Sequence, residues 1–288
     1  PDTILKLKTN QPQPKAEIDG DPKSAFREDP LKDYLVLAVP GVKDGLQGGF
    51  GDYSHIIRGS GAPKPLSNNG VEIKEAPYNG GAFYGSSMEF SDGDYLDFGN
   101  SEDFNFGSGD FTIELWRRRG DTGSTRNIIA VYDGSNNNHF WFGQSNSSGA
   151  YSGFWYYWNN GTNSNVRSDS TETDYTWDHL CAERYGKHVY FFLNGQLVDE
   201  NEFSSTQSLN SHTASLSLRI GRDQHTSANY SFVGGVSDIR VYKGVAKYKG
   251  AGFDCPNPYT PLNFGNDTSH HWSGEWKDTP RNNYPTVS

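Results

Sequence analysis

One stretch of alternating residues constrains the fold more than any other part of the sequence. It runs from Asp92 to Trp116 and reads DGDYLDFGNSEDFNFGSGDFTIELW. Near its end, Phe111, Ile113 and Leu115 alternate with Thr, Glu and Trp. A period of two belongs to a β-strand with one face on a core and the other on solvent or on a second layer. The stretch therefore predicts a strand and not a helix.

The composition extends this prediction to the whole chain. Aromatic residues make up 14% of the 288 residues, and glycine occurs 33 times, which favours many short strands joined by tight turns. A chain of this length suits one large β domain with appendages or two smaller domains, and the composition favours the first. The clearest turn is Asn194-Gly195, because this dipeptide readily adopts the positive φ angles of a type I′ hairpin.

Both ends of the sequence differ from its middle. Residues 1–33 are polar, charged and interrupted by prolines, which predicts an extended arm. Residues 265–288 form a polar tail with scattered tryptophans and no periodicity. The strand patterns lie within residues 34–264, which we expect to form one domain. Residues 243–248, which follow the last strand pattern, could form a short helical turn.

Charge and hydropathy exclude some classes of partner. A net charge of −10 argues against nucleic acid, because binding phosphates requires a surplus of Lys and Arg. The sequence has no run of about 18 apolar residues for membrane insertion, and its first ten residues lack the apolar core of a signal peptide. We therefore expect a protein that is made in the cytosol and is not inserted in a membrane.

Two local features have both a structural and a functional interpretation. Arg117, Arg118 and Arg119 end a predicted strand. They either contact phosphate or an acidic sugar or, in the better interpretation, keep a strand end solvated. Cys181 and Cys255 could pair, but two cysteines without a secretory signal are more often reduced and buried.

Four segments occur in the order seen in one known family. They are GSGDFTIELW at 107–116, WDHLCAER at 177–184, YFFLNGQLV at 190–198, and LRIGRD followed by GGVSDIRVYKGVAKY within 218–248. Together they resemble the laminin-G-like, concanavalin-A-like lectin/glucanase domain, over residues 34–264. The resemblance implies an all-β fold, a jelly-roll sandwich of two antiparallel sheets, with the arm and the tail outside it.

The last of these segments is most similar to versions of the domain in structural proteins of tailed bacteriophages, especially marine ones. This similarity implies a virion surface protein, made in the host cytoplasm, that serves as a fibre, spike or capsid decoration. Residues 1–33 would bind other virion proteins or sister subunits in a homo-oligomer, and the sandwich would adhere to host-surface glycans. The alternatives are a free carbohydrate-binding module of cellular origin and a glycoside hydrolase, because one fold serves all three.

The acidic residues argue against the hydrolase. Cleavage of a glycan needs two carboxylates that face one sugar bond, about 5–10 Å apart. The resemblance implies that hydrolases of this family carry the two carboxylates at alternate positions of one strand, around Glu-x-Asp-x-x-Glu. Glu114 stands alone on its strand, and Glu17-Ile18-Asp19 lies in the arm with no following Glu. We therefore predict no catalytic residues and no enzyme activity.

Aromatic and amide residues near the middle of the chain are the candidates for glycan binding. In the strand pattern of residues 153–158, alternate rings share a face, where they could stack on the C–H faces of sugars. Amides in the adjoining turns could hydrogen-bond sugar hydroxyls. The candidates are Asn137, His139, Trp141, Tyr156, Trp158, Asn159 and Asn160. The alternative is that both strand faces are buried, one in the sandwich and one under a loop or a neighbouring subunit.

No cofactor is predicted, and calcium is the metal that the sequence could bind. Its oxygen ligands could come from Asp92 and Asp94, from the turn at residues 133–138, or from the acidic residues at 199–202. None of these has the spacing of a known calcium loop, and turn residues on an acidic surface explain all three. His270 and His271 would point to opposite sides of an extended chain, and a zinc site would need further ligands that the sequence does not place.

Overall fold

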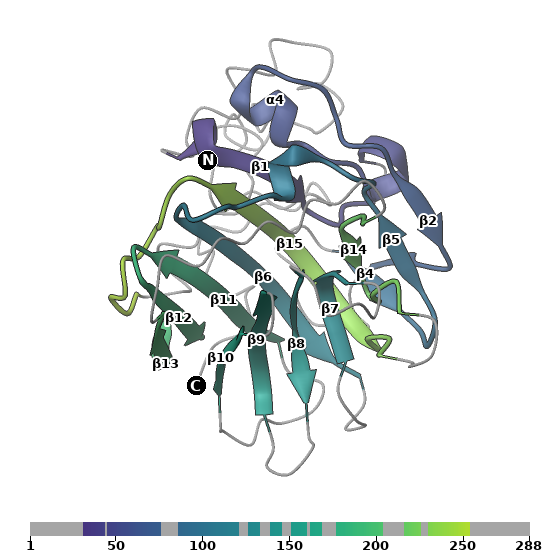
Figure 1. Ribbon diagram of the computed structural model, residues 1–288. Helices are drawn as coiled ribbons and strands as arrows, with labels where there is room; N and C mark the ends of the chain where they lie inside the picture. The colour runs from purple at the N-terminus through teal and green to yellow at the C-terminus, as the bar shows by residue number, and fades with distance from the viewer. Residues whose placement is uncertain are drawn as a thin grey trace, which may run out of the picture.

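The computed structural model describes residues 31–43, 45–75, 86–120, 126–132, 139–145, 151–159, 162–168, 177–203, 216–225 and 230–253. Within these residues the protein is all-β, and its strands form two antiparallel sheets (Figure 1). This arrangement confirms the predicted fold class, a jelly-roll sandwich of two antiparallel sheets. Residues 1–30 of the predicted arm and the whole of the predicted tail lie outside the described residues.

The first sheet contains the strand that the sequence identified most clearly. In spatial order its strands are β13 (Gln196–Glu202), β12 (His188–Leu193), β11 (Trp177–Tyr185), β6 (Phe111–Arg119), β15 (Gly234–Lys243), β4 (Ser86–Phe90) and β3 (Glu72–Glu75), and β1 (Leu35–Val39) also pairs with β15. The strand β15 therefore has β6 on one side and both β4 and β1 on the other.

The second sheet contains the remaining strands. In spatial order its strands are β10 (Thr162–Ser168), β9 (Tyr151–Asn159), β8 (His139–Ser145), β7 (Arg126–Val131), β14 (Arg219–Ile220), β5 (Tyr95–Asp97) and β2 (Ser67–Asn69). The helices are η1 (Lys32–Tyr34), η2 (Leu46–Gly49), α4 (Ser54–Arg58) and η3 (Glu102–Phe104). None of these described helices has the length and hydropathy needed to cross a membrane.

The hydrophobic core lies between the two sheets. Phe111, Ile113 and Leu115 of β6 are fully buried in it, as their alternation predicts. Phe140 and Phe142 of β8 bring the second sheet into the same cluster. Fully burying one side chain of this size stabilises a fold by about 1.5–3 kcal/mol. The alternation in the sequence thus identifies the face that holds the sandwich together.

The turn between β12 and β13 has the predicted conformation. The φ angles of Asn194 and Gly195 are 51° and 77°, and two consecutive positive values are what a type I′ hairpin needs. The residues on either side, Leu193 and Gln196, are paired in the register. The two strands are therefore joined by a two-residue loop.

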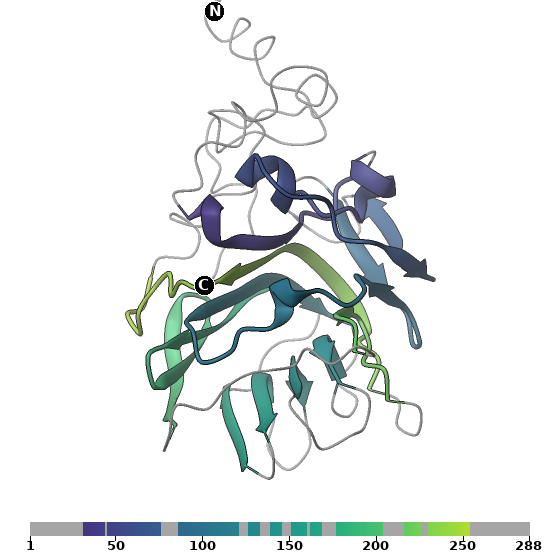
Figure 2. The ribbon, with the colours of Figure 1, turned by 45° about the horizontal axis from the view of Figure 1, so that its top comes forward.

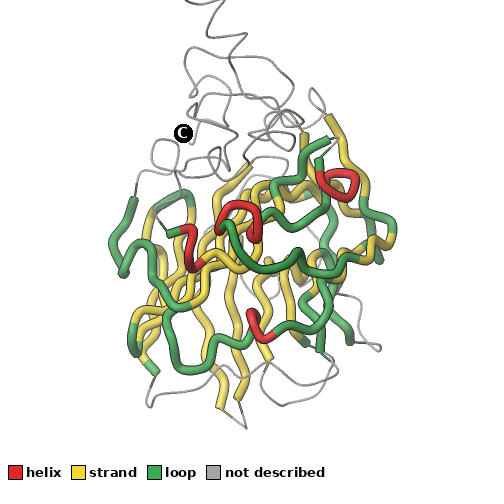
Figure 3. Tube along the Cα trace, turned by 90° about the horizontal axis from the view of Figure 1, so that it is seen from above, coloured by secondary structure: helices red, strands yellow, loops and turns green. Residues whose placement is uncertain are grey.

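A further layer covers part of the outer face of the first sheet. Figure 2 shows α4 above β1, the strand that pairs with β15, and Figure 3 shows the helices from above, in front of the strands. Ile57 of α4 and Trp116 of β6 belong to one apolar cluster outside the sandwich core. Asp52 fixes the layer, because its buried carboxylate accepts hydrogen bonds from the main-chain nitrogens of Ala38 at 3.0 Å and Ser54 at 2.8 Å.

After β15 the chain returns across the outer face of the first sheet, and we call residues 244–253 the strap. The main-chain nitrogen of Phe253 donates to the carbonyl of Gly195 at 2.7 Å, and the rings of Tyr248 and Phe253 stack with 3.6 Å between centroids. Residues 243–248 contain no helix, so the helical turn predicted there is wrong. The main-chain N–H groups of Tyr248 and Gly250 instead donate to the carboxylate of Glu183, which competes with helical hydrogen bonds.

Candidate functional site

The outer face of the second sheet carries a row of side chains that crosses four neighbouring strands. The register pairs Trp141 of β8 with Ala130 of β7, Ala130 with Arg219 of β14, and Arg219 with Asp97 of β5 (Figure 1). Directly paired residues in an antiparallel sheet share a face. The residues on either side of Trp141 along β8 are buried in the sandwich core, so Trp141 and its row belong to the outer face.

Aromatic rings from this face contact one another, and we call them the aromatic patch: Tyr132, His139, Trp141, His225 and Tyr230. The Tyr132 centroid is 4.4 Å from His139, 4.8 Å from Trp141 and 5.6 Å from His225. His139 and Trp141 are stacked at 5.0 Å, and His225 lies 6.3 Å from Tyr230. His139 is buried, whereas the other four are half-buried. The patch therefore presents a continuous, partly exposed aromatic surface.

Asp223 holds the loop that carries His225 against this surface. Its buried carboxylate accepts hydrogen bonds from Nδ2 of Asn127 at 2.7 Å and from the main-chain nitrogen of His225 at 3.0 Å. The main-chain nitrogen of Gln224 donates to the carbonyl of Tyr132 at 2.8 Å. Burial raises the pKa of Asp223, and its hydrogen bonds offset this only in part. The loop is thus tied to Asn127 of β7 and to Tyr132, the residue that follows β7.

Two of the residues predicted to bind glycan, His139 and Trp141, belong to the aromatic patch. The strand β9 pairs Trp158 with His139 and Tyr156 with Trp141. The backbone therefore brings these four predicted positions together on two neighbouring strands. The partial exposure of Trp141 also means that the outer face of β8 is not wholly covered by the described residues.

The structure describes one of the three asparagines predicted to bind glycan. Asn159 is the last residue of β9, whereas Asn137 and Asn160 lie outside the described residues. Their hydrogen bonding to a glycan stays a prediction.

The sequence analysis missed Tyr132, His225 and Tyr230. Tyr132 follows the last residue of β7 and continues its alternation with Ala130, which is a local signal that could have identified it. His225 and Tyr230 come from a much later part of the chain, and only the pairing of β14 with β7 brings them to this face.

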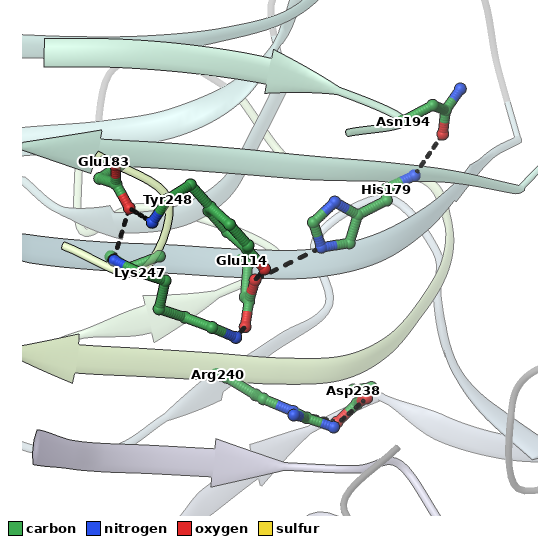
Figure 4. Close-up of polar contacts among 9 residues, drawn as sticks. Glu114, His179, Glu183, Asn194, Asp238, Arg240, Lys247 and Tyr248 are labelled. Atoms are coloured by element: carbon green, nitrogen blue, oxygen red, sulfur yellow. Dashed lines mark hydrogen bonds and ion pairs between the residues drawn. The ribbon is translucent and has the colours of Figure 1, made fainter. Parts of the chain in front are cut away.

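The outer face of the first sheet carries a second concentration of functional groups, shown in Figure 4. We call Glu114, His179, Glu183, Lys247 and Tyr248 the polar cluster. The fully buried Glu114 accepts a hydrogen bond from Oη of Tyr248 at 2.7 Å, forms an ion pair with Lys247, and lies 3.6 Å from Nε2 of His179. Burial alone would raise the pKa of Glu114, but Lys247 and His179 outweigh it and hold this pKa well below its ordinary range.

The pKa of Glu183 is shifted in the opposite direction. Its carboxylate accepts hydrogen bonds from the main-chain nitrogens of Tyr248 at 2.8 Å and Gly250 at 3.3 Å, and from Oγ1 of Thr112 at 3.2 Å. Burial dominates over these contacts and raises the pKa of Glu183. The register pairs Glu183 with Thr112, two residues from Glu114 on β6. Two carboxylates with opposite pKa shifts therefore share one face.

Carboxylates shifted in opposite directions are typical of acid–base pairs in glycosidases. In this protein both carboxylates are bound by the strap: Lys247 and Tyr248 contact Glu114, and Tyr248 and Gly250 contact Glu183. A sugar could reach them only by displacing the strap. The polar cluster therefore anchors the strap to the first sheet.

The arginines at the end of β6 are also used within the protein. Nη2 of Arg117 lies 3.2 Å from Asp178, and Nη2 of Arg118 lies 2.7 Å from Glu89. Arg117 and Arg119 are buried, so the prediction of a solvated strand end is wrong for both. They are buried because they continue the alternation of Phe111, Ile113 and Leu115 on the face toward the second sheet. Nη1 of Arg117 donates there to Oε1 of Gln144 on β8 at 3.1 Å.

The cysteine and metal predictions are only partly covered by the described residues. Cys181 is buried, as predicted, and Cys255 lies outside the described residues. Within the part of the chain that the structure describes, no three His, Cys, Asp or Glu side chains could hold a metal ion together. Calcium binding stays a prediction, and one of its candidate sites, the turn at residues 133–138, lies outside the described residues.

The two packed antiparallel sheets define a concanavalin-A-like sandwich, and comparison with protein families agrees. A laminin G family model, described as the Concanavalin A-like lectin/glucanases superfamily, matches residues 90–247, more than half of the chain. The chain belongs to this family. No curated protein sequence is similar enough to count as a match.

Several solved structures share the fold at low sequence identity. The binding domain of Paraclostridial Mosquitocidal Protein 1 has a TM-score of 0.57 and 14% identity, over 76% of this chain and 51% of that one. Domain 4 of the arabinanase AbnA from Geobacillus stearothermophilus, in complex with arabinotriose, has a TM-score of 0.52 and 11% identity, over 74% and 94%. A structure of botulinum neurotoxin type C has a TM-score of 0.52 and 13% identity, over 75% of this chain and 49% of that one. The chain thus spans about half the length of either toxin chain.

Proposed function

We propose that the protein is a non-catalytic carbohydrate-binding protein and that the aromatic patch on the second sheet is its binding surface. The observation that carries this proposal is the contact of Trp141 and Tyr132, whose half-buried rings lie 4.8 Å apart on the outer face. Flat aromatic surface that is partly open to solvent stacks well on the C–H faces of sugars. The polar cluster on the first sheet is bound by the strap and offers no comparable surface.

The related structures support the same class of ligand. Domain 4 of the arabinanase was solved with arabinotriose, and botulinum neurotoxin type C is described as depending on two ganglioside molecules for cell entry. Arabinotriose is an oligosaccharide, and a ganglioside carries an oligosaccharide on a lipid. Because their identity to this chain is low, the position of the site rests on this chain's own residues.

The two carboxylates of the polar cluster are the basis for proposing that the protein is not a catalyst. Hydrolysis needs an acid and a second carboxylate that face one sugar bond. Glu114 and Glu183 are both buried and hydrogen-bonded to the strap. We therefore propose that they are structural and that the protein holds glycans without cleaving them.

Removing the central ring tests the proposal. Trp141→Ala is expected to reduce retention on a neutral-glycan array at least tenfold, because it removes the largest ring of the patch. A tenfold loss corresponds to about 1.4 kcal/mol, the size expected when one ring loses its contact with a sugar. Tyr185→Ala is the matched control, since Tyr185 is 44% exposed at a hairpin of the other sheet. Equal retention by both variants would contradict the proposal.

We further propose that the protein acts on the surface of a tailed-phage virion, as a fibre, spike or capsid decoration that adheres to host glycans. The support is the sequence of residues 234–248, which resembles phage structural proteins. Residues 1–33 would bind other virion proteins or sister subunits, and a homo-oligomer would strengthen weak glycan contacts. A free carbohydrate-binding module of cellular origin is the alternative.

Light scattering separates these two roles. The full chain is expected to be an oligomer and a chain that lacks residues 1–33 a monomer, because the arm is the proposed contact between subunits. Both should show the same cooperative unfolding, since the described sheets begin at Leu35. A monomeric full chain would favour the free module over the virion protein.

A further inference from the structure

The row that contains Trp141 does not end at the aromatic patch. It continues through Ala130 to Arg219 of β14 and Asp97 of β5. Neighbouring strands are about 4.8 Å apart, so Trp141 and Arg219, two strands apart, have backbones separated by about 10 Å. The residue between them is the smallest side chain in the row. Two long side chains thus flank a short one on the outer face of the sheet.

Arg219 and Asp97 form a fixed ion pair at this end of the row. Nε of Arg219 lies 2.8 Å from Oδ2 of Asp97, and the guanidinium carbon lies 4.4 Å from the centroid of the Tyr95 ring. Oγ of Ser217 donates to Oδ2 of Asp97 at 3.0 Å, and the main-chain nitrogen of Gly99 donates to Oδ1 at 2.8 Å. The orientation of both charged groups is therefore set before any ligand arrives.

The pair keeps hydrogen-bonding capacity that faces solvent. The side chains of Arg219 and Asp97 are 20% and 19% exposed. Arg219 donates from Nε to Asp97 and from Nη1 to the carbonyl of Asp223 at 3.3 Å. A guanidinium has five N–H groups in a planar fork, so these contacts leave donors for a ligand. A donor beside an acceptor on a rigid surface suits two neighbouring hydroxyls of one sugar unit.

From this geometry we infer that the site extends from the aromatic patch to the Arg219–Asp97 pair and that its ligand is a neutral oligosaccharide of at least two units. One unit stacks on the aromatic patch, and the next places neighbouring hydroxyls on Arg219 and Asp97. The inference rests on the proposed function, because it assigns the ligand class and the second half of the same site.

The charges favour a neutral ligand. The positive charge of Arg219 is balanced by Asp97 at 2.8 Å, and the chain as a whole carries a net charge of −10. The negative net charge would repel an anionic glycan, and Arg219 cannot compensate because Asp97 already neutralises its charge. Hydroxyl groups use the same donor and acceptor without a net charge.

A ligand-length series tests the inference by titration calorimetry on the full chain. The probes are arabino-oligosaccharides and cello-oligosaccharides of one to four units. For one of these series, affinity is expected to rise at least tenfold from one unit to three. Arg219→Ala is expected to lose at least tenfold in affinity for three units and less than twofold for one. Trp141→Ala is expected to lose affinity for every length.

Two further variants keep the result interpretable. Arg219→Lys keeps the positive charge but loses the planar fork, so it should show the same length-dependent loss even if Arg219→Ala folds poorly. Arg118→Ala is the matched control, because the Arg118–Glu89 pair lies on the other sheet with both side chains 12% exposed. It should leave all affinities unchanged.

The outcomes separate the two proposals. If binding depends on Trp141 but does not increase with length, or if Arg219→Lys keeps full affinity for three units, the extended site is wrong and the proposed function stands. Tighter binding of sialyllactose than of any neutral probe would also overturn the extended neutral site. If the unaltered protein binds no probe of any length, both proposals fail.

Discussion

Replacing Lys247 with methionine is expected to lower the free energy of unfolding by about 3–5 kcal/mol. Lys247 of the strap forms an ion pair with Glu114, which is fully buried on β6. Methionine fills a similar volume but leaves the Glu114 carboxylate without its cation. Removing one partner of a buried pair costs far more than the pair itself contributes, because the remaining charge stays desolvated. The hydrogen bond from Tyr248 compensates only in part.

Chemical denaturation of the full chain measures this effect. Lys43→Met is the matched control, because Lys43 pairs with Glu75 at 2.8 Å with side chains 51% and 56% exposed. An exposed pair contributes at most about 1 kcal/mol, so the control should change stability little. A similar small change in both variants would show that the Lys247–Glu114 contact does not hold the strap. Lys247→Met combined with Glu114→Gln should recover part of the loss.

Acidification from pH 7 to pH 5 is expected to destabilise the protein, mainly through His179. Burial lowers the pKa of His179 and outweighs the neighbouring Glu114, so the folded protein keeps the imidazole neutral. In the unfolded chain the imidazole takes up a proton below about pH 6.5. The unfolded state then binds more protons, and stability falls as pH falls. Each unit by which folding lowers this pKa is worth about 1.4 kcal/mol at low pH.

Glu114 adds to this loss at lower pH, and Glu183 opposes it. The folded pKa of Glu114 is lowered, so its contribution is lost as pH falls below the ordinary glutamate range. The folded pKa of Glu183 is raised, so the folded protein protonates it first and gains stability over the interval above that range. His179→Gln is therefore the informative variant: its unfolding free energy should change less between pH 7 and pH 5 than that of the unaltered protein. An unchanged slope would contradict the assignment to His179.

Local patterns in the sequence were sufficient to predict the elements of the fold. Phe111, Ile113 and Leu115 alternate, and all three are buried between the sheets. The Asn194-Gly195 dipeptide predicts a hairpin, and its φ angles are both positive. These predictions succeed because the period of a strand and the conformation of a two-residue turn are set by residues next to one another.

The sites depend on pairings that no local pattern contains. Glu114 is alone on its strand in the sequence, and only the register of β6 and β11 brings Glu183 to the same face. In the same way, Arg219 reaches the row of Trp141 because β14 inserts between β7 and β5. A helical turn was expected for residues 243–248, but the main-chain nitrogen of Tyr248 donates instead to Glu183 on the distant strand β11.

The position of β15 has a consequence for how the protein is made. This strand comes near the end of the described chain, yet it lies between β6 on one side and β4 and β1 on the other. Until Gly234–Lys243 has left the ribosome, the earlier strands of the first sheet have a gap where their shared neighbour belongs. At about 5–20 residues per second, the edges of β6, β4 and β1 that pair with β15 stay unpaired for many seconds. A chaperone that covers them during synthesis would therefore raise the yield of folded protein.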